Sequence, residues 1–213
     1  MQQLPMYPTL ESARLAAQEC RACARSETRS QVVFGAGATR ARLMLVGESP
    51  SGTDDATGKP FTGPAGRLLD HLLGELGIHR RDLWITNLTR CFAGVERNGR
   101  IENRPARSAE IRACAPWLEL ELRYVNPKVI VAIGAPAAKY FLGASFQLTA
   151  QRGSAFEVVG GRVVIPTVQP AYVMRLQSID PSRYDLARAE LLEDLRTAAI
   201  AAGMLPPRPP LPE

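Results

Sequence analysis

The fold is decided by GESPSGTDD at residues 47–55, together with GKPFTGPAGRLLD at residues 58–70. A short apolar run from Arg42 to Val46 precedes this stretch. Leu and Ala then recur at helical spacing from Ala65 to Leu76, and Gly77 ends the pattern. A buried strand, a turn rich in glycine and proline, and a helix are therefore expected in that order. This order is typical of the strand-helix-strand units that build a parallel sheet.

The same alternation continues along the rest of the chain. Besides residues 42–46, the expected strands are Leu83 to Leu88, Val129 to Ile133 and Val163 to Val168, each bounded by Gly, Pro or Asn. Further helices are expected from Arg107 to Tyr124, which stops before Pro127, and from about Pro181 to Ala202. We therefore predict an α/β fold with a central four-stranded parallel sheet.

Length and composition favour one compact, water-soluble domain. The chain has 213 residues, of which 46% are hydrophobic and 22% are charged, so residues 1–205 are expected to form one domain. The Pro-rich residues 206–213 are expected to form a loose tail. No apolar run approaches the roughly 20 residues that cross a bilayer, and the N-terminus does not resemble a signal peptide, so we expect a cytoplasmic location. The net charge of +5 suits a polyanion partner, but it is also common in proteins that never touch nucleic acid.

The four cysteines need an explanation other than disulfides, which a reducing cytosol disfavours. Cys20 and Cys23 form a CxxC pair after the first expected helix, and Cys91 and Cys114 follow far downstream. The two downstream residues could be ordinary buried thiols. The four thiolates together could instead hold zinc or an iron-sulfur cluster, and their spacing alone does not distinguish these metals.

The stretch at residues 47–70 resembles the first motif of the iron-sulfur uracil-DNA glycosylases, which comprise family four and the UdgX group. That motif reads GE-x-PG, an acidic pair, and G-x-PF-x-G-x-AG-x-LLD. Further matches follow in the family's order over roughly residues 14 to 200: Ile85-Thr86-Asn87, Arg112 to Trp117, Gly134, and Pro170 to Arg175. The resemblance implies a three-layer α/β/α fold, and it implies that Cys20, Cys23, Cys91 and Cys114 ligate a [4Fe-4S] cluster. Since hydrolysis needs no electron, we expect the cluster to act as a structural clip, with redox sensing as the alternative.

The resemblance also implies a pocket for a uracil that has been flipped out of DNA. Phe61 would stack on the base, although it could equally be a core residue. Asn87 would read the Watson-Crick edge, although an Asn after a strand is often only a loop cap. Glu48 follows the first strand, where α/β sheets place ligands, and is the first catalytic candidate, because a carboxylate there could orient water or steady positive charge on the sugar. Ser49 and Asp55 are expected to support the pocket.

Two loops are expected to hold the DNA backbone around the flipped nucleotide, since small residues permit a close approach to phosphates. They comprise Pro50, Ser51 and Gly52 in the first loop, and Tyr172 and Arg175 in the second. Arg175 would contact phosphate or the gap in the base stack, and Arg100 is a further candidate for contact with DNA. We expect a monomer that acts on uracil-containing DNA, single- or double-stranded.

Two positions depart from the family's pattern, and both concern histidine. Gln169 stands before Pro170 where the second motif normally has a histidine that stabilises the departing uracil. Glu102 stands where the UdgX loop carries a histidine that traps the sugar covalently, and the only histidines here are His71 and His79. Glu102 could be a base for water, an inert surface charge or a nucleophile, in that order of preference. A stable histidine-DNA adduct is not expected at this loop.

These departures leave four functions open. The leading hypothesis is a monofunctional uracil-DNA glycosylase that leaves an abasic site, with catalysis weakened by Gln169. The alternatives are a binder of uracil-containing or deaminated DNA with little or no catalysis, a glycosylase with another base preference, and an iron-sulfur electron carrier unrelated to DNA.

Overall fold

The computed structural model describes residues 7–97 and 99–207 of the chain. Its main sheet has six strands in the order β1-β3-β2-β6-β8-β7. These strands are β1 (Ala36–Gly37), β2 (Leu43–Gly47), β3 (Trp84–Asn87), β6 (Val129–Ile133), β7 (Phe156–Val158) and β8 (Arg162–Thr167). The strands β3, β2, β6 and β8 pair in parallel, whereas β1 and β7 add to the two edges in antiparallel orientation. The sheet is therefore mixed and has six strands, unlike the four-stranded parallel sheet that we predicted.

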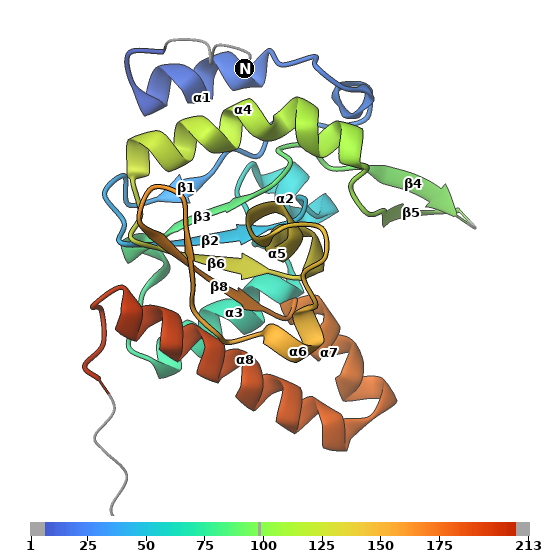
Figure 1. The fold of residues 1–213 in the computed structure, drawn as a ribbon. Helices are drawn as coiled ribbons and strands as arrows, with labels where there is room; N and C mark the ends of the chain where they lie inside the picture. Colours follow the sequence, from blue (N-terminus) through green and yellow to red (C-terminus); the bar gives the residue numbers. More distant parts are fainter. Residues whose placement is uncertain (1–6, 98, 208–213) are drawn as a thin grey trace, which may run out of the picture.

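Helices surround this sheet, and a separate hairpin projects from it. The α-helices are α1 (Leu10–Gln18), α2 (Gly52–Thr57), α3 (Pro64–Glu75), α4 (Ser108–Val125), α5 (Ala135–Leu142), α6 (Leu148–Gln151), α7 (Pro170–Ile179) and α8 (Pro181–Ala201). Two short 3₁₀ helices are η1 (Ala24–Glu27) and η2 (Arg80–Asp82), and the hairpin consists of β4 (Gly94–Arg97) and β5 (Arg100–Asn103). Figure 1 shows this hairpin extending away from the body of the protein.

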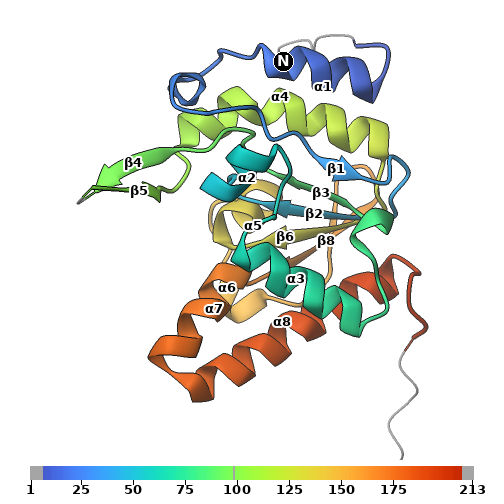
Figure 2. The same ribbon diagram turned by 180° about the vertical axis from the view of Figure 1, so that it is seen from behind.

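The buried strands divide their side chains between two cores, which gives the fold its three layers. Leu43 and Leu45 of β2 point into a core shared with α3, α7 and α8. Met44 and Val46 point to the opposite face, into a core shared with α1, α4 and α5. This alternation is the period of two that a strand imposes. Helices therefore cover both faces of the sheet, with α1 lying outside α4 (Figure 1 and Figure 2).

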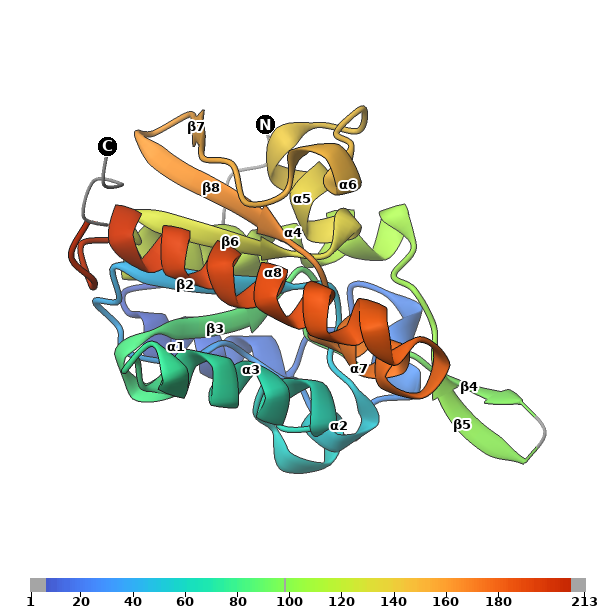
Figure 3. The ribbon, with the colours of Figure 1, turned by 90° about the horizontal axis from the view of Figure 1, so that it is seen from below.

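The parallel pairing brings the carboxyl ends of four strands to one edge of the sheet. Gly47 of β2 is aligned with Asn87 of β3, and Ile133 of β6 is aligned with Thr167 of β8. The helices α2, α5 and α7 begin just beyond this edge (Figure 3). In α/β sheets the carboxyl edge is where ligands usually bind, so the fold places the loops that follow these strands in a favourable position for a site.

No helix in residues 7–97 and 99–207 combines the length and apolarity needed to cross a membrane. The predicted boundary between a domain at residues 1–205 and a tail at residues 206–213 stays a prediction, because residues 1–6 and 208–213 lie outside the described part of the chain.

Candidate active site

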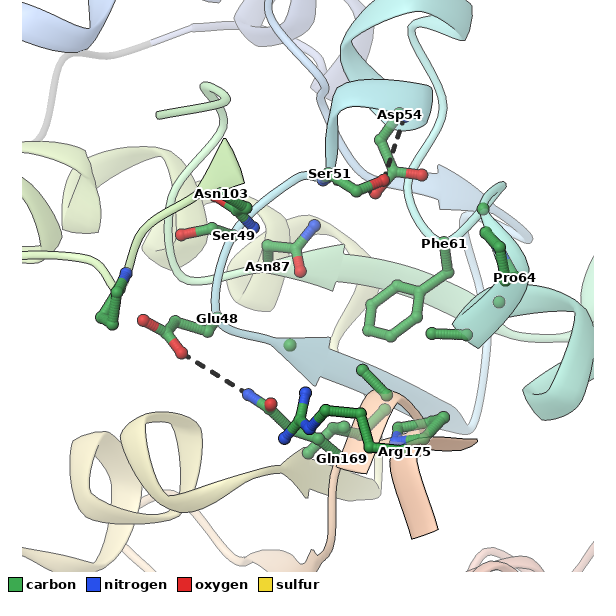
Figure 4. A pocket seen from close by; sticks show the side chains of 18 of the residues that line it. Glu48, Ser49, Ser51, Asp54, Phe61, Pro64, Asn87, Asn103, Gln169 and Arg175 are labelled. Carbon is green, nitrogen blue, oxygen red and sulfur yellow. Dashed lines mark hydrogen bonds between the residues drawn. The ribbon is translucent and has the colours of Figure 1, made fainter. Parts of the chain in front are cut away.

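A cavity of about 430 Å³ opens at the carboxyl edge of the sheet. Its lining comes from five parts of the chain: the end of β2 with the segment that leads into α3, the end of β3, the end of β5 with the segment after it, the end of β6, and the segment around the start of α7. The residues are Gly47, Glu48, Ser49, Ser51, Asp54, Phe61, Gly63, Pro64, Ala65, Gly66, Asn87, Asn103, Arg104, Pro105, Ile133, Gln169, Pro170, Ala171 and Arg175. Figure 4 shows Glu48, Phe61, Asn87 and Gln169 grouped around this space.

Asn87 and Phe61 both pack against the bare backbone of Gly47. A Cβ atom on Gly47 would lie 2.5 Å from Asn87 Oδ1 and 2.6 Å from Phe61 Cζ. Asn87 is buried, and its Nδ2 atom has no hydrogen-bond partner among the described residues. A buried amide without a partner costs free energy unless a ligand supplies an acceptor. This atom therefore points to a polar ligand in the cavity.

The backbone of Phe61 is held in an unusual conformation. Its φ angle is +55°, in the left-handed region that bulky residues rarely adopt. Arg80 stabilises this turn by donating from Nη1 to Pro60 O at 2.8 Å and from Nη2 to Phe61 O at 2.6 Å. The start of α3 also packs closely, because a Cβ on Gly66 would lie 1.8 Å from Phe61 O. Strain of this kind costs about 1–3 kcal/mol and often marks a functional residue.

Glu48 and Gln169 lie next to each other and both line the cavity (Figure 4). Oε1 of Glu48 accepts a hydrogen bond of 2.6 Å from the backbone N–H of Ala106, in the segment after β5. Oε2 of Glu48 accepts a long contact of 3.5 Å from Gln169 Nε2. Gln169 itself packs on Gly134, where a Cβ would lie 2.5 Å from Gln169 Cγ. One carboxylate oxygen is thus anchored, and the other is only weakly held.

The four cysteines line a second, small cavity between α1, α4 and the loop after β3, which is lined by Ala17, Cys20, Ala22, Cys23, Arg29, Val32, Arg90, Cys91, Ala113, Cys114 and Trp117. Three N–H groups point at the sulfurs. Arg29 Nη1 donates to Cys91 Sγ at 3.2 Å, Arg90 N donates to Cys114 Sγ at 3.3 Å, and Trp117 Nε1 donates to Cys20 Sγ at 3.4 Å.

Burial makes the inner two of these thiols hard to ionise. It raises the pKa of Cys114 to about 11 and also raises the pKa of Cys91. A bound metal reverses this preference, because a thiol that coordinates a metal gives up its proton. Within the described residues, no three His, Cys, Asp or Glu side chains lie close enough to hold a single metal ion.

Comparison with known proteins identifies the family. Residues 34–196 match the family described as the uracil DNA glycosylase superfamily. The chain belongs to the uracil-DNA glycosylase superfamily. Among its relatives is the type-4 uracil-DNA glycosylase of Thermotoga maritima, which is 37% identical over 182 residues, or 85% of this chain and 88% of the relative. The type-4 enzyme of Sulfurisphaera tokodaii is 33% identical over 76% of this chain and 74% of the relative, and the type-5 enzyme of Thermus thermophilus is 31% identical over 81% of each.

In this superfamily member, the two carboxylates of the acidic pair lie in different surroundings. Asp55 is buried outside the cavity lining and accepts hydrogen bonds from Ser30 N at 2.8 Å and Gln31 N at 3.4 Å. Its neighbour Asp54 lines the cavity instead. Asp54 accepts from Thr62 N at 2.6 Å, and it completes the cap of α2 by accepting from Ser51 N at 2.9 Å. Both carboxylates therefore hold loops around the uracil-DNA glycosylase cavity.

The predicted DNA-contacting residues are only partly brought together. Ser51 and Arg175 line the cavity, and Arg175 is exposed. Pro50, Gly52 and Tyr172 are not among the lining residues. The side chain of Arg100 lies outside the described part of the chain.

The hairpin region also differs from the sequence prediction. Glu102 is exposed on β5, opposite Val95 of β4, and it does not line the cavity. The next two residues, Asn103 and Arg104, do line it, and the sequence analysis did not single them out. The resemblance to the UdgX loop drew attention to this segment through Glu102, the residue directly before these two.

Proposed function

We propose that this chain removes uracil from DNA by hydrolysing the N-glycosidic bond, leaving an abasic site, as a monofunctional enzyme of base excision repair. The observation that carries the proposal is the unpartnered Nδ2 of the buried Asn87, beside Phe61 and across the cavity from Glu48. The names of the type-4 and type-5 relatives support the same activity.

Asn87 has the donor and acceptor that the Watson-Crick edge of uracil requires. Its Nδ2 can donate to O4 and its Oδ1 can accept from N3–H. Cytosine presents an amino group in place of O4 and has no N3–H, so its edge fits this amide poorly. Phe61 supplies a ring for the flipped base to stack on, and the close packing of both side chains on Gly47 leaves little freedom for a larger base. We therefore propose that uracil is the preferred base.

Glu48 is the proposed catalytic carboxylate. It orients a water molecule whose oxygen attacks C1′ of the sugar, while the N-glycosidic bond breaks and its electron pair leaves with the uracil N1. The proton of the water passes to Glu48 and then to solvent, and the uracil anion takes up a proton after departure. The weakly held Oε2 of Glu48 is the oxygen available for this step.

Gln169 would stabilise the departing uracil in place of a histidine. Its Nε2 is a neutral donor that lines the cavity beside Glu48. Removal of one such donor typically costs two to three orders of magnitude in rate, and a neutral amide retains part of this effect. We therefore propose slow turnover rather than none.

Glu102 is proposed to be a surface charge that takes no part in the chemistry. It is exposed on the hairpin and does not line the cavity, whereas the next residue, Asn103, does. The segment that follows contributes in another way, because its Ala106 N–H anchors Glu48. Hydrolysis through water at Glu48 leaves no covalent link between protein and DNA.

The four cysteines are proposed to hold a [4Fe-4S] cluster as a structural clip between α1, α4 and the loop after β3. The fit rests on four thiols around one cavity and on N–H donors aimed at three of the sulfurs. Such hydrogen bonds stabilise thiolates that bind iron.

The test uses a labelled single-stranded oligonucleotide with one uracil. After incubation, one half of the sample is treated with alkali, and the other half is run on a denaturing gel without alkali. We expect alkali-dependent cleavage that is lost in Glu48→Gln and retained in Glu102→Gln, with no shifted protein-DNA band. Intact strands with uracil-selective binding would show a reader of damaged DNA instead. A denaturant-stable adduct would contradict the hydrolytic mechanism.

A further inference from the structure

Arg25 is a fully buried charge between the cysteine cavity and the active-site cavity. It follows Cys23 by two residues, lies in η1, and is 1% exposed. A guanidinium cannot be buried without strong compensation from acceptors and a counter-charge. Its position near the proposed cluster ligands and its contacts with the active-site loops set it apart from the surface arginines.

The first set of contacts leads from Arg25 to the backbone of Glu48. Nη1 of Arg25 donates to Ser49 Oγ at 3.0 Å, to Thr89 Oγ1 at 2.9 Å and to Cys91 O at 2.7 Å. Thr89 in turn donates to the Glu48 carbonyl, from its backbone N at 3.1 Å and from its hydroxyl at 3.3 Å. The hydroxyls of Ser49 and Thr89 also share a hydrogen bond of 2.9 Å. The main chain at Glu48 is therefore fixed through Thr89.

The second set leads from Arg25 to the side chain of Glu48. Nε of Arg25 forms an ion pair of 3.0 Å with Glu110 Oε2. Glu110 accepts from Arg104 Nη1 at 2.9 Å and from Arg107 N at 2.8 Å, which fixes both ends of the segment at residues 104–107. Within this segment, the N–H of Ala106 holds Glu48 Oε1.

We propose that Arg25 is a positioning residue for Glu48, acting on its backbone through Thr89 and on its carboxylate through Glu110. The inference rests on the proposed catalytic role of Glu48. An arginine suits this task because its planar guanidinium can donate to Thr89 from one edge and pair with the Glu110 carboxylate from another, whereas a lysine is a single point charge. Arg25 thereby links the chain next to Cys23 and the carbonyl of Cys91 to the reacting carboxylate.

The variants Arg25→Gln and Arg25→Lys are compared with the wild type and with Glu48→Gln. Single-turnover excision, the Kd for uracil-containing DNA, iron content and visible absorption are measured for each. We expect Arg25→Gln to lower the excision rate by about 100-fold relative to the wild type, since a misplacement near 1 Å has effects of that size. We expect Arg25→Lys to recover only part of this loss. The Kd and iron content should stay near the wild-type values.

Arg152→Gln is the matched control. Arg152 is also largely buried and paired with Asp194, but that pair anchors α8 on the opposite face of the sheet. This variant should lose stability without a loss of single-turnover rate. If Arg25→Gln loses the cluster, the contact with Glu48 is tested by Thr89→Val instead. This variant removes the hydroxyl that joins Arg25 to the Glu48 carbonyl and keeps Arg25 in place. A wild-type excision rate in Thr89→Val would then overturn the role of Arg25.

The outcomes distinguish the proposed role of Glu48 from the proposed role of Arg25. If Glu48→Gln excises uracil at the wild-type rate, the role of Glu48 fails and the inference fails with it. If Glu48→Gln is inactive but Arg25→Gln behaves like Arg152→Gln, only the role of Arg25 is overturned. A Kd for uracil-containing DNA that rises as much as the rate falls in Arg25→Gln would also overturn it, because the effect would then lie in DNA binding and not in the position of Glu48.

Discussion

Gly47→Ala should abolish most activity without unfolding the protein. The added Cβ would lie 2.5 Å from Asn87 Oδ1 and 2.6 Å from Phe61 Cζ, whereas ordinary contact begins at 3.4 Å. Asn87 and Phe61 must therefore each retreat by about 0.8–0.9 Å. Gly47 does not have a left-handed φ angle, so alanine itself is tolerated by the strand.

The size of the effect follows from this displacement. A misplacement near 1 Å of groups that orient a substrate can cost about 100-fold in rate, which corresponds to about 2.7 kcal/mol of transition-state stabilisation. The assay is single-turnover excision of uracil with protein in excess over a labelled oligonucleotide. Thermal unfolding is measured in parallel, so that a loss of fold is recognised.

Gly74→Ala is the matched control for this substitution. Gly74 lies in α3, and nothing lies within 4 Å of the Cβ that alanine would add. Alanine there should stabilise the helix by about 0.5–1 kcal/mol and leave the excision rate unchanged. If Gly47→Ala excises uracil as fast as Gly74→Ala, the proposed reading of the base by Asn87 and Phe61 is refuted.

Three further predictions concern the framework of the site. Gly66→Ala, in the same helix as Gly74, should lower the melting temperature strongly, because its Cβ would lie 1.8 Å from Phe61 O; a stability equal to that of Gly74→Ala would contradict this. The hydrogen bond from Arg104 lowers the pKa of Glu110 from 4.5 to about 2, so the stability that the Glu110 carboxylate contributes is complete above pH 4.5 and is lost as the pH falls through about 2. Urea unfolding should therefore show a difference in the free energy of unfolding between wild type and Glu110→Gln that shrinks as the pH falls over this range. A difference that does not change with pH would refute the ion pair. Cys114→Ser should lose bound iron and visible absorption, and its helix α1 should become sensitive to protease. A wild-type protein that is active without bound iron or visible absorption would contradict the structural role of the cluster.

The sequence identified the four parallel strands because each is a buried apolar run with clear boundaries. It did not identify β1 and β7, since strands of two and three residues are too short to show a period. The hairpin β4–β5 was also missed, because residues 94–103 are mostly polar and Gly-containing. The helices α3, α4 and α8 lie within a residue or so of their predicted bounds.

Glu48, Asn87 and Gln169 all line the cavity at the carboxyl edge of the sheet. The sequence analysis chose them because they stand in the motifs of the family that the chain resembles, and Glu48 also because it follows a strand. It selected Asp55 from the acidic pair, whereas Asp54 lines the cavity, because one position along a short helix turns the side chain by about 100°. Arg25 was missed because its role depends on partners that are distant in the chain.

The most direct test of the central claim is the amount of free uracil that the purified protein releases from an excess of uracil-containing DNA. Released base is quantified by mass spectrometry over time, with Glu48→Gln as the control. We predict more than one uracil per protein molecule, released in step with abasic sites, and none with Glu48→Gln. Release that stops at or below one uracil per protein, or no release despite tight binding, would contradict the claim that this chain is a hydrolytic uracil-DNA glycosylase.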